Sequence, residues 1–338
     1  VPNKKHILVL LMSLIITTAI IGTSVPTYAA CDGQTATIDE ILGNQNPDGG
    51  WKKYYNVNTG EWKKSTIDNG ATYTEIRRLA QEYNKTQYKS YLNPIKKGIN
   101  FLLNMQYDNG GWPEIYQGQE YHAYIDYNDD SMINVMFLLD EVAKQTGDFT
   151  FIDDELAKKC EEAVKKGIDC VLKTQIVYNG EKQAWCQQYD PVTLEPAAGR
   201  AFELIGNSAS ESVGIVRFLM SIEKPSSEVK DAINSAVAWF KKVQIKGIRV
   251  EKQGGDVVVV EDPTAKPIWA RFYEIGTDRP FFSTIDGEKK YALAEINLER
   301  RTGYSWYGYW PENLINNEYP EWLTRDWDVY RNIIWCRK

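Results

Sequence analysis

Two short clusters of Asp and Asn residues stand where a helix is expected to begin. The first is Asp68-Asn69 and the second is Asn128-Asp129-Asp130. One Asp or Asn suffices to cap a helix N-terminus, so the second cluster exceeds what capping requires. Carboxylate and amide oxygens bind hard cations, and calcium tolerates their loose geometry better than magnesium does. The clusters therefore make Asp68, Asp129 and Asp130 candidate calcium ligands.

Three arginines lie among aromatic and turn residues instead of on the polar face of a helix. They are Arg200 in Gly-Arg-Ala-Phe-Glu, Arg271 in Trp-Ala-Arg-Phe-Tyr-Glu and Arg279 in Asp-Arg-Pro. Each has an ordinary explanation, such as a salt bridge from Arg271 to Glu274 or from Arg279 to Asp278. Together they are better explained by an anionic ligand, because guanidinium groups bind carboxylates through paired hydrogen bonds.

The composition limits the kinds of partner that this chain can have. Charged residues make up 25% of the sequence and the formal net charge is -7, so we expect no nucleic-acid partner, and an anionic substrate must be held locally. Eleven Trp and twenty-one Tyr offer flat faces that suit sugar rings, although packing explains most of them. His122 is the single histidine after residue 30, which excludes catalysis by a histidine cluster.

The first thirty residues have the pattern of a secretory signal peptide. Lys4 and Lys5 precede an apolar run over 7–21, which is followed by small residues up to Ala29. A membrane anchor is the alternative, but the run is shorter than the roughly 20 residues that a spanning helix needs. We expect a signal peptide over 1–29 and a single catalytic domain over 30–338, secreted and with no membrane partner after cleavage.

A repeat with a spacing of roughly sixty to seventy residues runs along the chain. Four helix-like segments each end in a glutamine, at Gln45, Gln106, Gln175 and Gln244. Gly-Gly-Trp turns follow the first two and end at Trp51 and Trp112, while the third segment leads to Trp185. The fourth segment is not followed by such a turn and Trp, so we expect the repeat to weaken toward the C-terminus. We expect Trp51 to fill the core, whereas Trp112 could either pack or contact sugar.

Second helices between the glutamines are predicted over 72–83, 130–145 and 208–222. The last of these pairs with a helix over 226–243, and the one clear strand is 256–261. Helix pairs at this spacing predict a mainly all-α fold, an α/α toroid or barrel of helix pairs with long loops and minor β structure. A stacked solenoid is the alternative, but it lacks evident capping repeats. In a toroid, the two acidic clusters would open at the same end.

These segments resemble the pectate lyases of the tenth polysaccharide lyase family. The matching segments span most of the chain in order: 66–72, 128–130, 199–203, 269–274, 279–280 and 299–304. The resemblance implies a toroid-like catalytic domain that cleaves polygalacturonate by β-elimination, with calcium as the cofactor and an arginine as the base. We expect the protein to act as a monomer on pectin outside the cell.

The resemblance also implies roles for individual residues. Asp68 and one of Asp129 and Asp130 would hold calcium, and Asn69 would assist. The segments of Arg200 and Arg271 match carboxylate-binding positions. Further candidates for contact with the substrate are Trp112, Glu211 and Tyr273.

The base is not assigned by the resemblance. In the family an arginine often precedes the Asp-Gly pair that here begins at Asp286, and this chain has Ile285 at that position. Arg279 and Arg271 are therefore the candidate bases. Because arginine has a pKa above about 12, such a base predicts an alkaline activity optimum.

Two other functions are compatible with the same residues. A glycoside hydrolase would use two carboxylates as acid and base or nucleophile, drawn from Glu114, Asp126, Glu203 and Glu211. A non-catalytic polysaccharide-binding protein would use the aromatic residues, with calcium in a structural role. The ultraviolet absorbance of an unsaturated uronate distinguishes a lyase from both.

Overall fold

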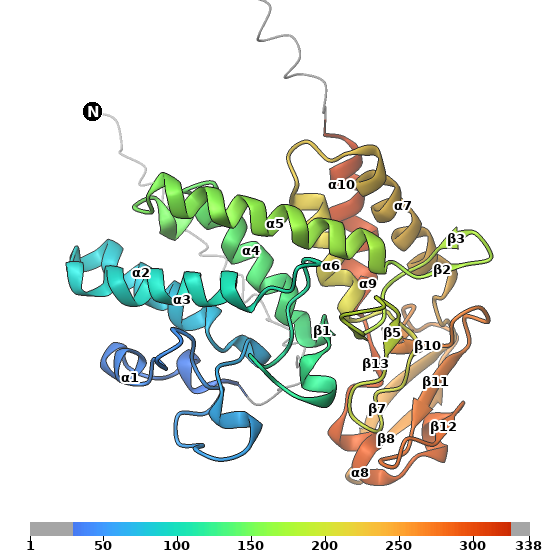
Figure 1. The fold of residues 1–338 in the computed structure, drawn as a ribbon. Coiled ribbons are helices and arrows are strands. Elements are labelled where there is room, and N and C mark those ends of the chain that lie inside the picture. Colours follow the sequence, from blue (N-terminus) through green and yellow to red (C-terminus); the bar gives the residue numbers. More distant parts are fainter. Residues whose placement is uncertain (1–29, 326–338) are drawn as a thin grey trace, which may run out of the picture.

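Six helices of more than ten residues form one side of the molecule. The computed structural model describes residues 30–325, so the expected signal peptide over 1–29 lies outside the described residues. Figure 1 shows these helices running from the blue to the yellow part of the chain: α2 (Tyr73–Thr86), α3 (Leu92–Met105), α4 (Ser131–Ala143), α5 (Asp154–Thr174), α6 (Glu211–Ser221) and α7 (Ser227–Lys242).

The helices begin where local chemistry favours it. Asp153 accepts a hydrogen bond from the backbone N–H of Leu156 at the start of α5, and Ser226 accepts one from Val229 at the start of α7. Helices α2, α4 and α6 confirm the second helices expected in the repeats, and α7 confirms the helix predicted over 226–243. Four shorter helices complete the set: α1 (Ile38–Gly43), α8 (Leu298–Gly303), α9 (Trp310–Asn313) and α10 (Tyr319–Leu323).

Buried tryptophans join each turn of the repeat to the end of the preceding helix. The indole N–H of Trp51 donates to the carbonyl of Ile41, and that of Trp112 donates to Leu102, both at 2.8 Å. Trp185 and Trp269 make the same bond, to Val171 at 2.8 Å and to Phe240 at 2.9 Å. The expectation that the fourth repeat lacks its Trp is therefore wrong, because Trp269 holds that position after a long insertion.

The hydrogen bonds of the repeated glutamines explain why the repeat has glutamine at this position. The side-chain amide of Gln106 donates to the carbonyl of Gly110 in its own turn and to that of Ala163 in the next helix. Gln45 makes the same bridge to Gly49 and Pro94, and Gln175 to Gln183 and Ala232. Each amide thus gives a donor to a turn carbonyl and joins that turn to the next long helix.

Thirteen strands lie in residues 30–325 and form five small antiparallel sheets. The four-stranded sheet has the order β12 (Lys289–Lys290), β11 (Pro280–Ser283), β10 (Phe272–Tyr273) and β6 (Asn207–Ser208). The three-stranded sheet joins β1 (Ile125–Asp126), β4 (Gln188–Tyr189) and β5 (Pro196–Ala197). The two-stranded sheets are β2 (Val177–Tyr178) with β3 (Glu181–Lys182), β7 (Ile248–Gln253) with β8 (Asp256–Glu261), and β13 (Tyr307–Gly308) with β9 (Trp269–Ala270).

The expectation of a mainly all-α toroid is wrong. Figure 1 shows the helices on one side and a group containing β7, β8, β10, β11, β12 and β13 beside α8 on the other. Strand β8 matches the predicted run over 256–261, but most strands have two residues. A strand of two residues is too short to show the alternating hydrophobicity by which strands are predicted. The fold is therefore a mixed α and β architecture.

Two hydrophobic clusters correspond to the two sides. The larger cluster lies among the helices and includes the four repeat tryptophans. The smaller one is largely aromatic and includes residues of β10 and β11: Phe202, Phe272, Phe281, Phe282, Leu293, Ile296, Tyr304 and Trp306. Within residues 30–325, no helix has the length and apolar character needed to cross a membrane.

Candidate active site

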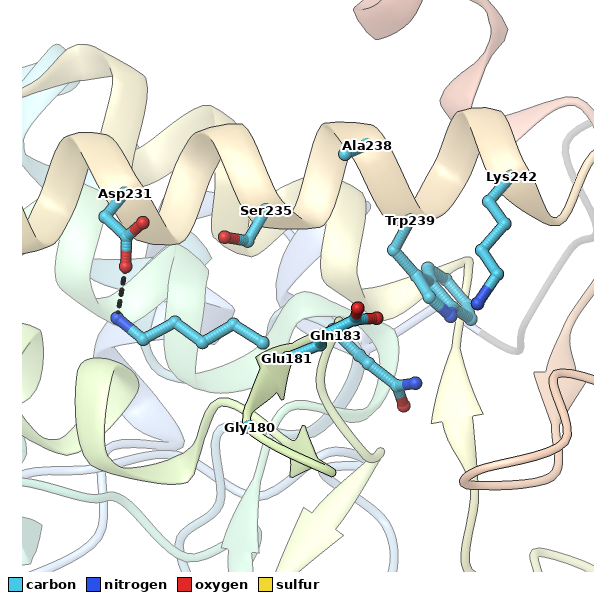
Figure 2. A pocket seen from close by; sticks show the side chains of 9 residues that line it. Gly180, Glu181, Gln183, Asp231, Ser235, Ala238, Trp239 and Lys242 are labelled. Carbon is cyan, nitrogen blue, oxygen red and sulfur yellow. Dashed lines mark hydrogen bonds and ion pairs between the residues drawn. The ribbon is translucent and has the colours of Figure 1, made fainter.

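A hollow of 430 Å³ lies between α7 and the hairpin of β2 and β3. Figure 2 shows Asp231, Trp239 and Lys242 on α7 facing Glu181 on the hairpin. Two ion pairs involve its lining: Lys182 with Asp231 at 2.7 Å, and Lys242 with Asp278 at 2.6 Å. None of the residues predicted for catalysis, substrate or metal lines this hollow.

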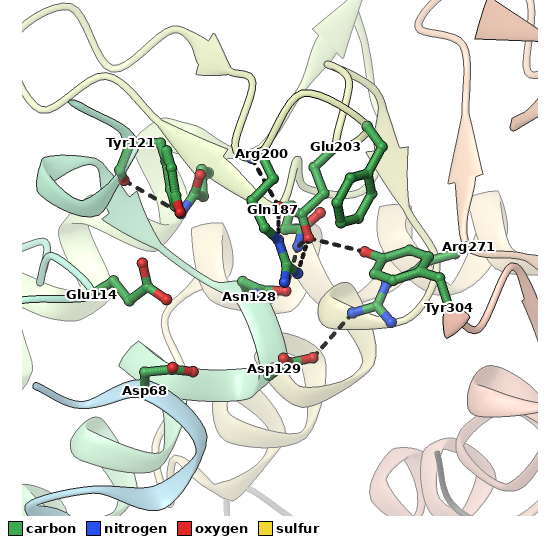
Figure 3. A network of polar contacts seen from close by, with 12 residues as sticks. Asp68, Glu114, Tyr121, Asn128, Asp129, Gln187, Arg200, Glu203, Arg271 and Tyr304 are labelled. Atoms are coloured by element: carbon green, nitrogen blue, oxygen red, sulfur yellow. Dashed lines mark hydrogen bonds and ion pairs between the residues drawn. The ribbon is translucent and has the colours of Figure 1, made fainter. Parts of the chain in front are cut away.

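A smaller pocket of 220 Å³ collects several of the predicted site residues. It lies where the turns before α2 and α4 meet the segment around Arg200. Figure 3 shows the carboxylates of Asp68 and Asp129 with Glu114 to one side and Arg200 above them. The lining residues are Lys53, Trp62, Asp68, Asn69, Glu114, Tyr121, Asn128, Asp129, Gln188, Arg200 and Glu203.

The two acidic clusters form equivalent short 3-10 turns, Asp68–Gly70 and Asn128–Asp130. The central residue of each turn is left-handed, with φ of 49° at Asn69 and 50° at Asp129. Non-glycine residues are uncommon there, and Asn and Asp are the types that tolerate it best. The Asp and Asn residues thus serve the turn as well as the pocket.

Asp68 has both carboxylate oxygens engaged. Its Oδ2 lies 2.7 Å from the ammonium nitrogen of Lys53, and its Oδ1 accepts a hydrogen bond from the side-chain amide of Asn69. The backbone N–H of Asp68 donates to the hydroxyl of Thr66 at 3.0 Å. The carboxylate is therefore held in place on the wall of the pocket.

Asp129 forms an ion pair with Arg271, which is buried and lies outside the pocket lining. The guanidinium Nη2 of Arg271 lies 3.1 Å from Oδ1 of Asp129 and also contacts Glu211. Burial raises the pKa of Asp129 to about 6, opposed by Arg271 and reinforced by the charges of Glu211 and Asp68. Asp68 and Asp129 line the same pocket, and the charge of one disfavours the charge of the other.

Asp130 points away from the pocket toward α6. A Cβ added at Gly214 would lie 2.0 Å from its Oδ1, so the carboxyl packs against that helix. Burial, together with the charges of Glu211 and Asp129, raises the pKa of Asp130 to about 7. The structure therefore brings Asp129 to Asp68 and leaves Asp130 outside the pocket lining.

Arg200 forms a paired interaction with Glu203. Its Nε lies 2.8 Å from Oε2 of Glu203, its Nη2 contacts Oε1, and its backbone N–H donates to Oε2 at 2.9 Å. Gln187 and the hydroxyl of Tyr304 also donate to Glu203, at 3.1 and 3.2 Å. Burial acts to lower the pKa of Arg200, but Glu203 outweighs it and the pKa ends above its ordinary value.

Glu114 and His122 form a buried pair beside the same pocket. Nδ1 of His122 lies 2.5 Å from Oε2 of Glu114, and the imidazole packs edge-on against Trp62. Burial raises the pKa of Glu114; the hydrogen bond to His122 opposes this shift and the charge of Asp68 adds to it. Glu114 is thus a third carboxylate of the pocket wall.

Besides Asp130 and Arg271, four further predicted residues do not reach the pocket lining. The indole of Trp112 is buried in the core, and the hydroxyl of Tyr273 donates to the carbonyl of Val243 at 3.0 Å. Glu211 is buried against Arg271, outside the pocket lining. Arg279 is exposed, and its guanidinium lies 3.6 Å from the ring centre of Tyr291.

Four residues of the pocket were not found from the sequence: Lys53, Trp62, Tyr121 and Gln188. Lys53 and Trp62 come from the loop after the first Gly-Gly-Trp turn. One signal was available, since the Trp-Lys-Lys triplet at 51–53 recurs at 62–64. The triplet gives no indication of which lysine points inward, because that depends on how the loop folds over the pocket.

The donor set of the pocket fits a divalent cation. Four carboxylates and two cationic side chains line it, an excess of two negative charges when all are ionised. Gln188 adds a buried side-chain oxygen with no hydrogen-bond donor among the described residues. Over residues 30–325, no three Asp, Glu, His or Cys side chains form a ready-made metal cluster, so a cation here would take other ligands as well.

Comparison with known proteins agrees with this geometry. The profile of the pectic acid lyase family matches residues 45–315. Two solved structures of the family 10 polysaccharide lyase from Cellvibrio cellulosa each have a TM-score of 0.78 and cover 86% of this chain and 94% of theirs. One is 34% identical in sequence; the other, 33% identical, is a mutant in complex with trigalacturonic acid.

Two curated proteins match over shorter stretches. A terpene cyclase/mutase from Nectria sp is 30% identical over 113 residues, which is 32% of this chain and 14% of that protein. Lanosterol synthase from Saccharomyces cerevisiae is 27% identical over 146 residues, 43% of this chain and 16% of that enzyme. The chain thus spans about a sixth of the length of these curated relatives.

The profile match and the two structures together define the class of this protein. It is a lyase of the polysaccharide-cleaving kind, and the chain belongs to the pectic acid lyase family. The resemblance to the tenth polysaccharide lyase family that was seen in the sequence motifs is confirmed.

Proposed function

We propose that this protein is a secreted pectate lyase that cleaves α-1,4-polygalacturonate by β-elimination and releases 4,5-unsaturated oligogalacturonides. One observation carries the proposal: Asp68, Asp129 and Arg200 converge on one pocket from three separate segments. The relative in complex with trigalacturonic acid supports a galacturonate substrate. The proposal includes export by the segment 1–29 and action as a monomer through the single domain 30–338.

Calcium is the proposed cofactor, with Asp68 and Asp129 as its protein ligands and Asn69 assisting. Two carboxylates from separate turns, beside amide oxygens, are the donor types that this cation takes, and positions remain for water and a substrate carboxylate. Calcium bound there would neutralise the uronate carboxylate and stabilise the negative charge that develops on it. Asp130 is not a proposed ligand, because it packs against α6.

Arg200 is the proposed base, because it is the arginine on the pocket lining. Its guanidinium, when neutral, accepts the proton from C5 of the uronate. The electrons of the C5–H bond then form the C4–C5 double bond as the C4–O bond breaks, and the leaving oxygen takes a proton from solvent. Arg271 lies below the pocket, where it positions Asp129, and Arg279 lies on Tyr291.

Because Arg200 is paired with Glu203, we expect proton abstraction by this base to be slow at neutral pH. Glu203 holds the guanidinium in its charged form, so the neutral fraction is small. A divalent cation bound in the same pocket would favour proton release, because like charges disfavour the charged guanidinium. We therefore expect an activity optimum well on the alkaline side of pH 7, whereas an optimum near pH 5 would indicate a carboxylate base.

The test uses purified protein and polygalacturonate, with chelator added and then reversed by calcium. A calcium-dependent lyase produces fragments that absorb in the ultraviolet and whose masses together equal that of the cleaved polymer. A hydrolase yields reducing ends without absorbance and adds one water per bond, which would overturn the proposal. Polymer binding with no new chain ends would indicate a binding protein instead.

A further inference from the structure

Lys53 is a pocket residue that the mechanism above does not use. Its ammonium nitrogen lies 2.7 Å from Oδ2 of Asp68, and the two side chains are only 12% and 4% exposed. A charge-assisted hydrogen bond at this distance is among the stronger polar contacts in a protein. Lys53 therefore occupies the pocket face of a proposed calcium ligand.

Several contacts hold the ammonium group there. The carbonyl of Lys53 accepts a hydrogen bond from the backbone N–H of Asp32 at 3.0 Å, which fixes the start of the loop. The ammonium nitrogen lies 5.3 Å from the ring centre of Trp62 and 5.4 Å from that of Tyr54. Aromatic faces attract cations at this range. The lysine is thus a built part of the pocket and not a solvated side chain that happens to reach an acid.

The pairing competes with cation binding at Asp68. Lys53 bonds one carboxylate oxygen and Asn69 bonds the other. A calcium ligand must bring an oxygen to about 2.3–2.6 Å from the ion, and an ammonium group at the same oxygen repels that ion. Lysine can give way because its charge sits on a flexible four-carbon stem.

We propose that Lys53 is a resident counter-ion of Asp68 that the divalent cation displaces, so that its charge weakens calcium binding in the free enzyme. The inference rests on the proposed role of Asp68 as a calcium ligand. It makes Lys53 a positioning residue, since it acts on the cation through Asp68.

The experiment is a calorimetric titration of chelated full-length protein with calcium. Lys53→Gln removes the competing charge and is expected to bind calcium about tenfold more tightly than the wild type, a change equivalent to ~1.4 kcal/mol. Lys63→Gln is the matched control: it removes the same charge from the same loop, but Lys63 is exposed and lies outside the pocket lining. Its affinity is expected to equal that of the wild type.

A second measurement needs no variant and so does not depend on how Lys53→Gln folds. Amine acetylation followed by mass spectrometry is expected to modify Lys53 of the wild type slowly without calcium and faster at saturating calcium. Lys63 should be modified equally in both states. Unchanged modification of Lys53 would overturn displacement.

The outcomes separate this inference from the proposed function. If the wild type forms unsaturated products in a calcium-dependent way, the proposed function stands. If Lys53→Gln then binds calcium no more tightly than the wild type and Lys63→Gln, the counter-ion role is wrong on its own. If product formation is unaffected by chelator and no variant binds calcium, both the cofactor assignment and this inference fail.

Discussion

Asn69 and Asp129 share one left-handed backbone conformation, with φ of 49° and 50°, at equivalent points of two successive repeats. The same turn therefore occurs twice before a helix. The first turn has its acid, Asp68, in the first position, and the second turn has Asp129 and Asp130 in the second and third positions. The result is that Asp68 and Asp129 line one pocket, although they hold different places in their turns. Asp130 is left-handed as well, with φ of 60°, but its carboxylate packs against Gly214 of α6 instead of lining the pocket.

Asp129→Asn is expected to lower kcat/KM for polygalacturonate by about 100-fold or more, because it removes a charge that would stabilise the transition state through the cation. Initial rates of unsaturated product formation, taken across calcium concentrations, measure this. Asp130→Asn is the matched control and should stay within about threefold of the wild type. Equal losses in the two variants would mean that the pocket assignment of Asp129 is wrong.

Arg200→Lys tests the base without leaving Glu203 buried and unpaired. Lysine has an ordinary pKa near 10.4, lower than that of arginine, so the rise of kcat with pH is expected to occur at lower pH. A shorter reach to C5 should also lower kcat by roughly 100-fold. The measurement is kcat as a function of pH at saturating polymer.

Arg279→Ala provides the comparison for that experiment, because Arg279 was one of the two candidate bases in the sequence, whereas Arg200 was expected to bind a carboxylate. Its guanidinium stacks on Tyr291 away from the pocket, so activity should remain within about twofold of the wild type. If Arg279→Ala abolishes activity and Arg200→Lys leaves the pH profile unchanged, the base lies elsewhere.

Trp112→Phe separates a core role from a sugar contact. The substitution removes the indole N–H that donates to Leu102 at 2.8 Å and leaves a buried carbonyl without its partner. The expected cost is ~1–3 kcal/mol in the free energy of unfolding, with KM for the polymer unchanged. Urea unfolding and steady-state kinetics read the two effects separately, and a raised KM with unchanged stability would point to substrate contact.

The buried carboxyl of Glu75 should make the free energy of unfolding depend on pH. It lies on α2, accepts a hydrogen bond from the hydroxyl of Tyr55 at 3.0 Å, and burial raises its pKa from 4.5 to about 7. The folded state therefore binds the proton more tightly than the unfolded state, so this contribution is complete below pH 4.5 and is lost as pH rises to about 7. The expected loss is ~3 kcal/mol.

Glu75→Gln stays neutral and should not show that loss. The stability of the variant relative to the wild type is expected to increase by ~3 kcal/mol between about pH 4 and pH 8. Urea unfolding at the two pH values measures this difference, in which any fixed cost of the amide cancels. A difference that does not change with pH would show that Glu75 is charged in the folded protein.

Local patterns were enough to predict the long helices and the family. Helix α4 has an apolar stripe that includes Ile133, Met136 and Leu139, which the sequence shows directly. The strands were missed because β4, β6 and β10 have two residues each and owe their existence to partners far along the chain. Trp269 was missed for a related reason: the hairpin of β7 and β8 separates it from the helix that it caps.

The amino-acid sequence by itself determined the repeat, the helices, the two acidic turns and the motifs of the family, since each depends on residues close together in the chain. Only the tertiary structure decided that Asp129 and not Asp130 faces Asp68, that Arg200 and not Arg279 lines their pocket, and that Lys53 sits on Asp68. Those choices depend on where turns, loops and helices from distant segments come to lie, and no local spacing records that.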